Sequence, residues 1–165
     1  MKQKILVIYA SRTRSTQSIA SAIAEVLVKR GANVDMRFIL DVSDISPYDA
    51  VVIGSSIRTG HLLPEVIRFV KIYHEQLRKK SVAYFIVCMT LYQNTPENRK
   101  KMMSALDPVC QWVEPVDIGL FGGILERKKL RLIWRILSLF TGFPEGDFRD
   151  FPSIRAWAAQ LAEKL

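Results

Sequence analysis

The sequence predicts an α/β protein in which five parallel strands form one sheet with helices on both faces. Two observations predict this fold class. Short apolar runs that suit strands alternate along the chain with segments whose apolar residues recur at helical spacing, beginning with a strand at Lys4–Tyr9. Several of these runs are apolar on both faces, as the buried strands of a parallel sheet are. Right-handed crossovers then place the connecting helices on both sides of the sheet.

The composition indicates one globular domain spanning residues 1–165. Hydrophobic residues make up 49% of the chain and charged residues 24%, which excludes a disordered chain, and no repeat or linker is visible. The net charge of +8 favours an acidic partner, which would be nucleic acid, an anionic membrane or an anionic small molecule. Much of the excess charge falls within one short stretch, which contains Arg127, Lys128, Lys129, Arg131 and Arg135.

Cysteine usage and hydropathy indicate a cytoplasmic protein. Cys88 and Cys110 form no C-x-x-C pair and have apolar neighbours, so we expect reduced thiols. The chain starts directly with a strand, and we expect no secretory segment. Its longest apolar stretch is interrupted by Arg135 and is shorter than the roughly 20 residues that cross a bilayer.

The first part of the chain reads as strand, helix and strand. The helix after Lys4–Tyr9 carries Ile19, Ile23 and Leu27 on its buried face and ends at Gly31, a residue typical of helix C-termini. Asn33–Ile39 alternates apolar and polar side chains, which predicts a strand near the edge of the sheet.

The middle of the chain continues the alternation. Asp49–Gly54 and Ser81–Met89 are apolar on both faces and predict central strands, whereas Pro64–Leu77 has helical spacing with proline in the first turn. Thr95 to Glu97 open a further helix, and Val113–Phe121 supplies the fifth strand.

An insertion at about residues 125–142 separates the fifth strand from the last helix, Phe151–Leu165. Leu125–Gly142 is predicted to be helical, starts with cations, and is apolar around most of its circumference. Such a helix buries both sides in protein or places one side in something apolar. The two hypotheses for Leu125–Phe140 are therefore an anionic membrane surface, or packing on this domain or on a second copy in a homo-oligomer.

A hydroxyl-rich stretch, Ser11-Arg12-Thr13-Arg14-Ser15-Thr16, lies between the first strand and the first helix. The N–H groups of the first helical turn and the helix dipole attract anions there, and the hydroxyl groups can donate to phosphate oxygens. An ordinary helix cap is the alternative, but a cap needs only one hydroxyl. Nucleotide-hydrolysing and dinucleotide-binding loops require glycine patterns that are absent here.

This stretch resembles the flavodoxin loop T/S-x-T-G-x-T, which binds the monophosphate of FMN. Ser11, Thr13 and Thr16 fall on its hydroxyl positions, while Arg14 stands where the family usually has glycine. Glycine tolerates positive φ, whereas arginine adopts it only at an energetic cost, and Arg14 would instead add a cation beside the phosphate. The resemblance implies a flavodoxin-like three-layer sandwich with strand order 2-1-3-4-5. It also implies an FMN site at the carboxyl ends of the strands, with every residue of Ser11–Thr16 as a phosphate-binding candidate.

Two further loops would then border the flavin ring. The loop after the third strand contributes Ser56, Ile57, Arg58, Thr59, Gly60 and His61, and the loop after the fourth contributes Met89, Thr90, Leu91 and Tyr92.

Arg58 and His61 are the catalytic candidates. The Arg58 fork would hold a carboxylate or stabilise reduced, anionic flavin, and the alternative is a surface arginine. His61 would donate to a flavin oxygen or to a substrate, or else be a capping or surface residue. Tyr92 would stack on the ring, or else be a core tyrosine at the sheet edge.

One segment is similar to a narrower family. Val51–His61 resembles V-V-I-G-A-S-I-R-Y-G-H of the menaquinone-dependent protoporphyrinogen oxidases, and the similarity extends to Phe69–Lys71 and to the basic insertion followed by Asp150–Phe151. The departures are Arg14 and a shorter segment at 143–149. The resemblance implies an FMN enzyme of heme biosynthesis that passes electrons from protoporphyrinogen IX to menaquinone or ubiquinone. It would work on the inner face of the cell membrane.

Three alternatives remain open. A flavodoxin-type electron carrier would have no substrate site, but carriers are usually acidic and this chain is basic. A soluble FMN quinone or NAD(P)H reductase would share the fold, as would a flavodoxin-like domain without FMN. The sequence shows no pattern typical of nucleic-acid binding, since its basic patch is interleaved with Leu, Ile and Trp, and it predicts no metal site.

Overall fold

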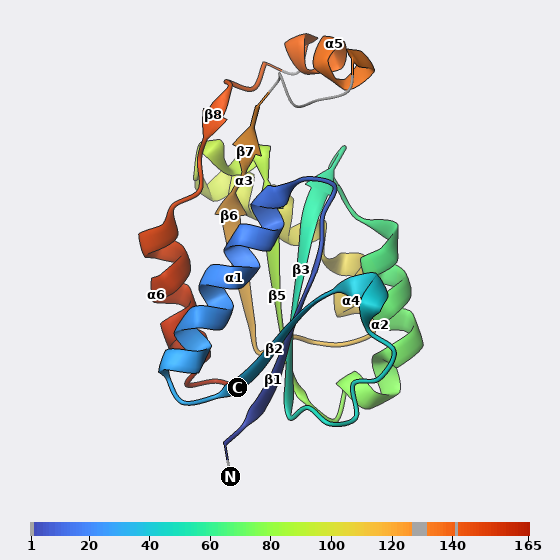
Figure 1. Ribbon diagram of the computed structural model, residues 1–165. Coiled ribbons are helices and arrows are strands. Elements are labelled where there is room, and N and C mark those ends of the chain that lie inside the picture. The colour runs from blue at the N-terminus through green and yellow to red at the C-terminus, as the bar shows by residue number, and fades with distance from the viewer. Residues whose placement is uncertain (1, 127–131, 141) are drawn as a thin grey trace.

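A computed structural model describes residues 2–126, 132–140 and 142–165. Five parallel strands form the central sheet in the order β2-β1-β3-β5-β6 (Figure 1). This arrangement confirms the predicted order 2-1-3-4-5, because the fourth and fifth long strands along the chain are β5 and β6. The strands are β1 (Lys4–Ala10), β2 (Asn33–Phe38), β3 (Ala50–Arg58), β5 (Ser81–Cys88) and β6 (Asp117–Gly122).

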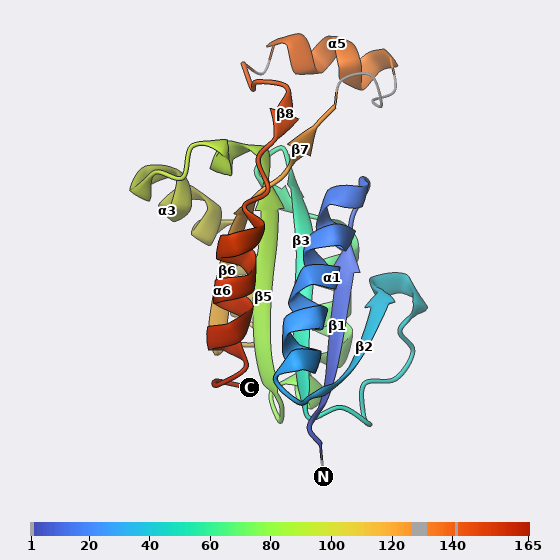
Figure 2. The same cartoon turned by 60° about the vertical axis from the view of Figure 1, so that its left-hand side comes forward.

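Helices cover both faces of the sheet, as Figures 1 and 2 show. On one face lie α1 (Arg14–Lys29) and α6 (Phe151–Leu161), and on the other lie α2 (Pro64–Leu77), α3 (Pro96–Ser104) and α4 (Asp107–Cys110). Two short 3₁₀ helices, η1 (Ile39–Asp41) and η2 (Met89–Tyr92), follow β2 and β5.

The strand β1 shows why these residues fold this way. Successive side chains of a strand point to opposite faces. Ile5 and Val7 accordingly pack in the core under α1 and α6, while Leu6 and Ile8 pack in the core under α2. All four are at most 1% exposed, so the apolar run is required on both faces.

The inserted segment leaves the carboxyl edge of the sheet as a two-stranded antiparallel ribbon. β7 (Ile124–Leu125) pairs with β8 (Gly146–Asp147), and α5 (Leu132–Phe140) lies beyond the ribbon, away from the sheet (Figures 1 and 2). The prediction of a helix from Leu125 was wrong at its start, since Leu125 pairs with Gly146 in a strand. The predicted cationic turn at 127–131 lies outside the described residues.

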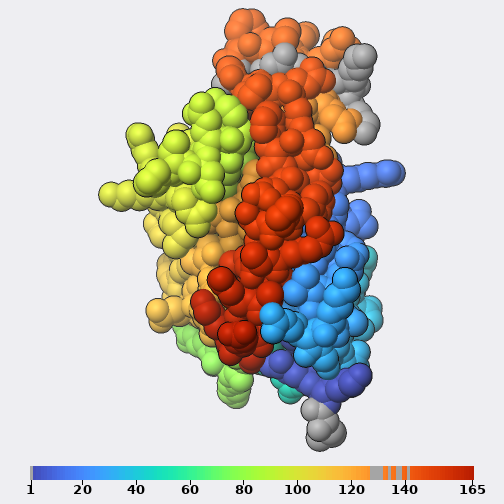
Figure 3. All heavy atoms as spheres, turned by 90° about the vertical axis from the view of Figure 1, so that its left-hand side faces the viewer, coloured from blue at the N-terminus to red at the C-terminus, as the bar shows by residue number. Residues whose placement is uncertain are grey.

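The last helix and the termini complete the domain. α6 ends at Leu161 rather than at Leu165, and the Gln3 amide donates to the Leu165 carbonyl at 2.7 Å, which joins the two ends of the chain. In Figure 3 the C-terminal segment runs down one face between α3 and α1, with α5 at the far end from the termini. Cys88 and Cys110 are free thiols. Among the described residues, no helix has the length and apolar character that crossing a membrane requires.

Candidate functional site

The sheet register brings the loops named above to one edge. Ala10 lies beside Ser55, Ser56 beside Val87, and Cys88 beside Gly122. The segments that follow β1, β3, β5 and β6 therefore leave the sheet side by side. This is the edge at which open α/β sheets bind ligands.

The hydroxyl-rich stretch forms a compact loop and the first turn of α1. Thr13 is the N-cap, but its side chain makes no capping hydrogen bond. Its backbone N–H instead donates to Ser11 Oγ at 3.0 Å, Ser11 Oγ donates to the Thr13 carbonyl, and Thr13 Oγ1 lies 3.1 Å from Ser15 Oγ. The Thr13 hydroxyl therefore does not cap the helix, and the hydroxyl groups of this loop bond to one another and to the loop backbone instead.

Thr16 stands out within this turn. Its side chain is fully buried, and its Oγ1 has no hydrogen-bond partner among the residues that the structure describes. Leaving a buried hydroxyl unpaired costs on the order of 1–3 kcal/mol. A buried, unpaired donor at a helix N-terminus fits an anionic ligand that accepts a hydrogen bond.

Arg14 is accommodated without strain. It is the first residue of α1, and within the described ranges the one non-glycine residue with positive φ is Thr59. The backbone at Arg14 therefore does not require the conformational freedom of glycine. Arg14 is exposed, which leaves its cation available at the mouth of the loop.

A pocket of about 470 Å³ opens against this loop. Its walls come from two parts of the chain, Arg12–Ser15 on one side and Ile124–Glu126 on the other. The residue that follows β6 also approaches the loop, since a Cβ built on Gly123 would lie 3.9 Å from Ser15 Oγ. Two arginines and two hydroxyl residues line this pocket, together with the carboxylate of Glu126 on the opposite wall. Arginine and hydroxyl groups are the donors that a phosphate monoester binds.

Arg12 is held by α2. Its guanidinium lies 3.2 Å from Glu65 Oε1 and 3.4 Å from Oε2, and the Glu65 side chain is only 10% exposed. This ion pair directs the Arg12 guanidinium toward α2 and partly offsets its charge.

The loop after β3 is a tight hairpin. Arg58 pairs with His61 of β4 (His61–Leu62), and the turn between them has Thr59 at φ 49° and Gly60 at φ 80°. Positive φ at both turn residues is typical of the two-residue hairpin turn, and Gly60 adopts it without steric cost. Arg58 and His61 are thus directly opposite cross-strand neighbours, and both are exposed.

The loop after β5 is the 3₁₀ helix η2, which begins with a hydrogen bond from the Thr90 N–H to Cys88 Sγ at 3.4 Å. The Asn98 amide donates to the Thr90 carbonyl at 3.1 Å and fixes the loop to α3. Leu91 is buried, and the Tyr92 ring meets Phe143 and Phe148 edge to face, at centroid distances of 6.0 and 5.7 Å. Tyr92 therefore lies against residues of the segment that joins α5 to α6.

The structure brings the three predicted loops to the same edge, but it divides them into two groups. Arg12–Ser15 line the pocket, whereas the hairpin residues Ser56–His61 and the η2 residues Met89–Tyr92 do not. The ribbon residues Ile124–Glu126 form the other wall and were not predicted as site residues. A strand of two residues is too short to show the alternation of apolar and polar side chains by which strands are recognised in a sequence.

Comparison with solved structures identifies the fold. Flavodoxin 1 from Bacillus cereus superposes with a TM-score of 0.62 at 17% identity, covering 99% of each chain. Flavodoxin 2 from the same organism gives 0.61 at 24% identity, covering 98% of this chain and 99% of that one.

Curated relatives are similar in sequence. The protoporphyrinogen IX dehydrogenase [quinone] of Leishmania major is 26% identical over 174 residues, covering 96% of this chain and 74% of the relative. The Escherichia coli K12 protein of the same name is 33% identical over 98 residues, covering 58% of this chain, and the match spans about half of that relative, 53%. A family model described as a flavodoxin domain matches residues 6–139, which is most of the sequence. This chain therefore belongs to the flavodoxin domain family.

Proposed function

We propose that this protein is an FMN-dependent oxidoreductase that takes electrons from protoporphyrinogen IX and passes them to a membrane quinone, menaquinone or ubiquinone, in heme biosynthesis. FMN is the cofactor that membership of the flavodoxin domain family implies. The substrates are those in the names of the curated relatives from Leishmania major and Escherichia coli. Each two-electron step would remove two hydrogens from the porphyrinogen and convert one quinone to a quinol.

The observation that carries the FMN assignment is the pocket that Arg12, Thr13, Arg14 and Ser15 line at the start of α1. The next residue, Thr16, has a buried hydroxyl with no hydrogen-bond partner among the residues that the structure describes. In this proposal the loop 11–16 holds the FMN phosphate through hydroxyl groups, backbone N–H groups and arginine side chains. Bound FMN supplies the two-electron redox chemistry, and the protein orients it and tunes its electronics.

Arg58, His61 and Tyr92 would act at the substrate side of the same edge. In the proposal, the Arg58 fork holds a propionate of the porphyrinogen and His61, its cross-strand neighbour, donates a hydrogen bond to the flavin or to the substrate. The remaining residues of Ser56–His61 and Met89–Tyr92 would border the ring, with Tyr92 beside it.

The helix α5 supports a peripheral membrane location for a cytoplasmic enzyme. Among the side chains of α5 that the structure describes, the exposed apolar ones are Leu132, Ile133, Ile136, Leu139 and Phe140, which are 48–83% exposed. Such a surface suits contact with the bilayer that dissolves the quinone. A homo-oligomer that buries α5 is the competing account.

Titration of the purified apoprotein with FMN tests the cofactor site. We expect tighter binding of FMN than of FAD, because the loop serves one terminal phosphate. Thr16→Ala and Ser11→Ala should each weaken FMN binding, by roughly 1–3 kcal/mol for a lost charge-assisted hydrogen bond. Ser104→Ala, which removes an exposed hydroxyl at the end of α3, is the control and should change nothing. Equal or tighter binding of FAD would refute the assignment.

An anaerobic assay with protoporphyrinogen IX and a soluble quinone tests the reaction. We expect porphyrin fluorescence to appear only when FMN-loaded protein and quinone are both present, with Thr16→Ala slower at limiting FMN. An electron carrier would behave differently, because its FMN would be reduced by a reductase partner while protoporphyrinogen remained unchanged. That outcome would overturn the enzyme proposal and leave the FMN site intact.

A further inference from the structure

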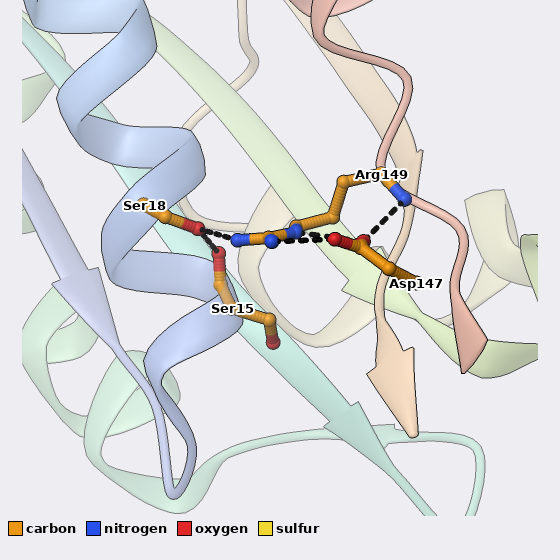
Figure 4. Close-up of polar contacts among 4 residues, drawn as sticks. All are labelled: Ser15, Ser18, Asp147 and Arg149. Atoms are coloured by element: carbon orange, nitrogen blue, oxygen red, sulfur yellow. Dashed lines mark hydrogen bonds and ion pairs between the residues drawn. The ribbon is translucent and has the colours of Figure 1, made fainter. Parts of the chain in front are cut away.

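A chain of hydrogen bonds connects the inserted ribbon to the first turn of α1 (Figure 4). The Arg149 guanidinium donates to both carboxylate oxygens of Asp147, at 2.8 and 2.6 Å, and its third nitrogen donates to Ser18 Oγ at 2.6 Å. Ser18 Oγ in turn donates to the Ser15 carbonyl at 2.8 Å. The contact between Arg149 and Ser18 joins residues 131 positions apart.

The direction of this chain is fixed by chemistry. A guanidinium has donors and no acceptor, so Ser18 Oγ accepts from Arg149. The single hydroxyl hydrogen of Ser18 is then directed to the Ser15 carbonyl. Arg149 is itself held rigidly, because its side chain is only 17% exposed, both of its carboxylate bonds go to Asp147, and the Phe151 ring lies 5.1 Å from its guanidinium carbon.

The neighbouring backbone holds the same segment against the sheet. The Phe148 N–H donates to the Gly123 carbonyl at 2.9 Å. A Cβ on Gly122 would lie 2.5 Å from the Phe148 carbonyl oxygen, so the two backbones are in direct contact. The backbone next to Arg149 is therefore held against the end of the sheet, and the Arg149 side chain extends from there to α1.

The Ser15 carbonyl belongs to the peptide group whose N–H is that of Thr16. Thr16 is the third residue of α1, where an N–H has no carbonyl of the helix to bind, and the Thr13 side chain does not cap it. A hydrogen bond accepted by a peptide carbonyl strengthens its N–H as a donor, by an estimated 10–30% per bond. The series of hydrogen bonds that starts at Arg149 thus ends at the backbone N–H of Thr16, the residue with the buried hydroxyl.

We propose that Arg149 is a positioning residue for the phosphate monoester of the flavin, acting through Ser18 on the Ser15–Thr16 peptide. The inference rests on the proposed FMN function. Because Asp147 neutralises the guanidinium, the effect runs through the hydrogen-bond chain and not through long-range attraction. Arg149, which connects the ribbon to α1, thereby also raises the affinity of the loop for the flavin phosphate.

Comparison of FMN with riboflavin, which lacks the phosphate, separates this role from a purely structural one. We expect Ser18→Ala and Arg149→Met to weaken FMN binding by roughly three- to tenfold and to change riboflavin binding less than about twofold. Ser18→Ala is the milder variant, because alanine is favoured inside a helix and the Arg149–Asp147 pair is left in place. Arg155→Met is the matched control: Arg155 lies over the same Phe151 ring, 5.5 Å from it, and it is exposed.

The outcomes are distinct. Equal losses of FMN and riboflavin affinity in the variants would make Arg149 a structural residue, and unchanged FMN affinity would remove its role, while in both cases the FMN site stands. A wild-type protein that binds neither flavin would overturn this inference together with the proposed function. Far-UV circular dichroism and the thermal midpoint establish that each variant is folded.

Discussion

Thr13, Ser15 and Thr16 carry hydroxyl groups within four residues, and the structure gives them different surroundings. The hydroxyls of Thr13 and Ser15 lie 3.1 Å apart, whereas that of Thr16 is buried without a partner in the described part of the chain. The sequence predicted a cluster of phosphate donors, and it could not tell which donors are already engaged. Which hydroxyl groups are engaged depends on the hydrogen bonds between Ser11 and Thr13 and on the packing around the loop, and neither can be read from the sequence.

Arg58 carries a prediction at the same scale. Arg58→Lys should lower turnover with protoporphyrinogen and quinone on the order of tenfold, since lysine keeps the charge but lacks the planar fork that binds a carboxylate through two bonds. FMN content should stay near that of the wild type. Steady-state kinetics and the flavin absorption spectrum measure the two quantities.

Arg68→Lys, an exposed substitution on α2, serves as the control for Arg58→Lys and should leave both quantities unchanged. Steady-state constants of Arg58→Lys that match the wild type would assign Arg58 to the surface.

Among the elements, those buried on both faces were predictable. β1, β3 and β5 are apolar runs enclosed by two helical layers, so hydrophobic periodicity identifies them and the alternation with helices fixes the topology. The β3–β4 hairpin and the β7–β8 ribbon were missed. Their pairs are two residues long, and Thr59 at positive φ is not a residue that signals such a turn. The ribbon also joins segments about twenty residues apart, which no local pattern records.

The helix α5 carries a prediction about membrane binding. We expect the protein to float with anionic liposomes, with less binding as salt rises, because the apolar surface and nearby cations both contribute and salt screens only the cations. Ile133→Ser combined with Phe140→Ser should abolish flotation without loss of stability, since the two side chains are 65% and 83% exposed.

Ile72→Ser is the matched control for flotation. Ile72 is 61% exposed on α2, so it removes a comparable apolar group away from α5 and should leave flotation unchanged. A wild-type protein that stays in the soluble fraction even at low salt would rule out the membrane proposal. Gel filtration would then show whether the same α5 double variant dissolves an oligomer.

At the scale of the whole molecule, four carboxyl groups link folding to pH. Hydrogen bonds lower the pKa of Asp147 through Arg149, of Asp150 through the Ser153 side chain, and of Asp44 through the Ser46 backbone. Burial raises the pKa of Asp117, but bonds from the Lys164 ammonium, at 2.5 Å, and from the Ile118 backbone outweigh it, and the pKa lies below its usual range. All four pKa values are thus shifted in the same direction.

A lowered pKa in the folded state means that the unfolded chain takes up protons first as the pH falls. The stability that these carboxylates contribute is therefore complete above the ordinary aspartate pKa of about 4, and it is lost as the pH drops through the folded pKa values. Calorimetry should show a thermal midpoint that declines below about pH 4, and Asp117→Asn should lower the midpoint at pH 7 and flatten this decline. Because the chain already carries a charge of +8, repulsion also grows on acidification, so the scans are repeated in about 0.5 M salt, which screens repulsion between exposed charges. If the midpoint in high salt were the same at pH 3 and pH 7, the hydrogen bonds to these carboxylates would contribute nothing to stability.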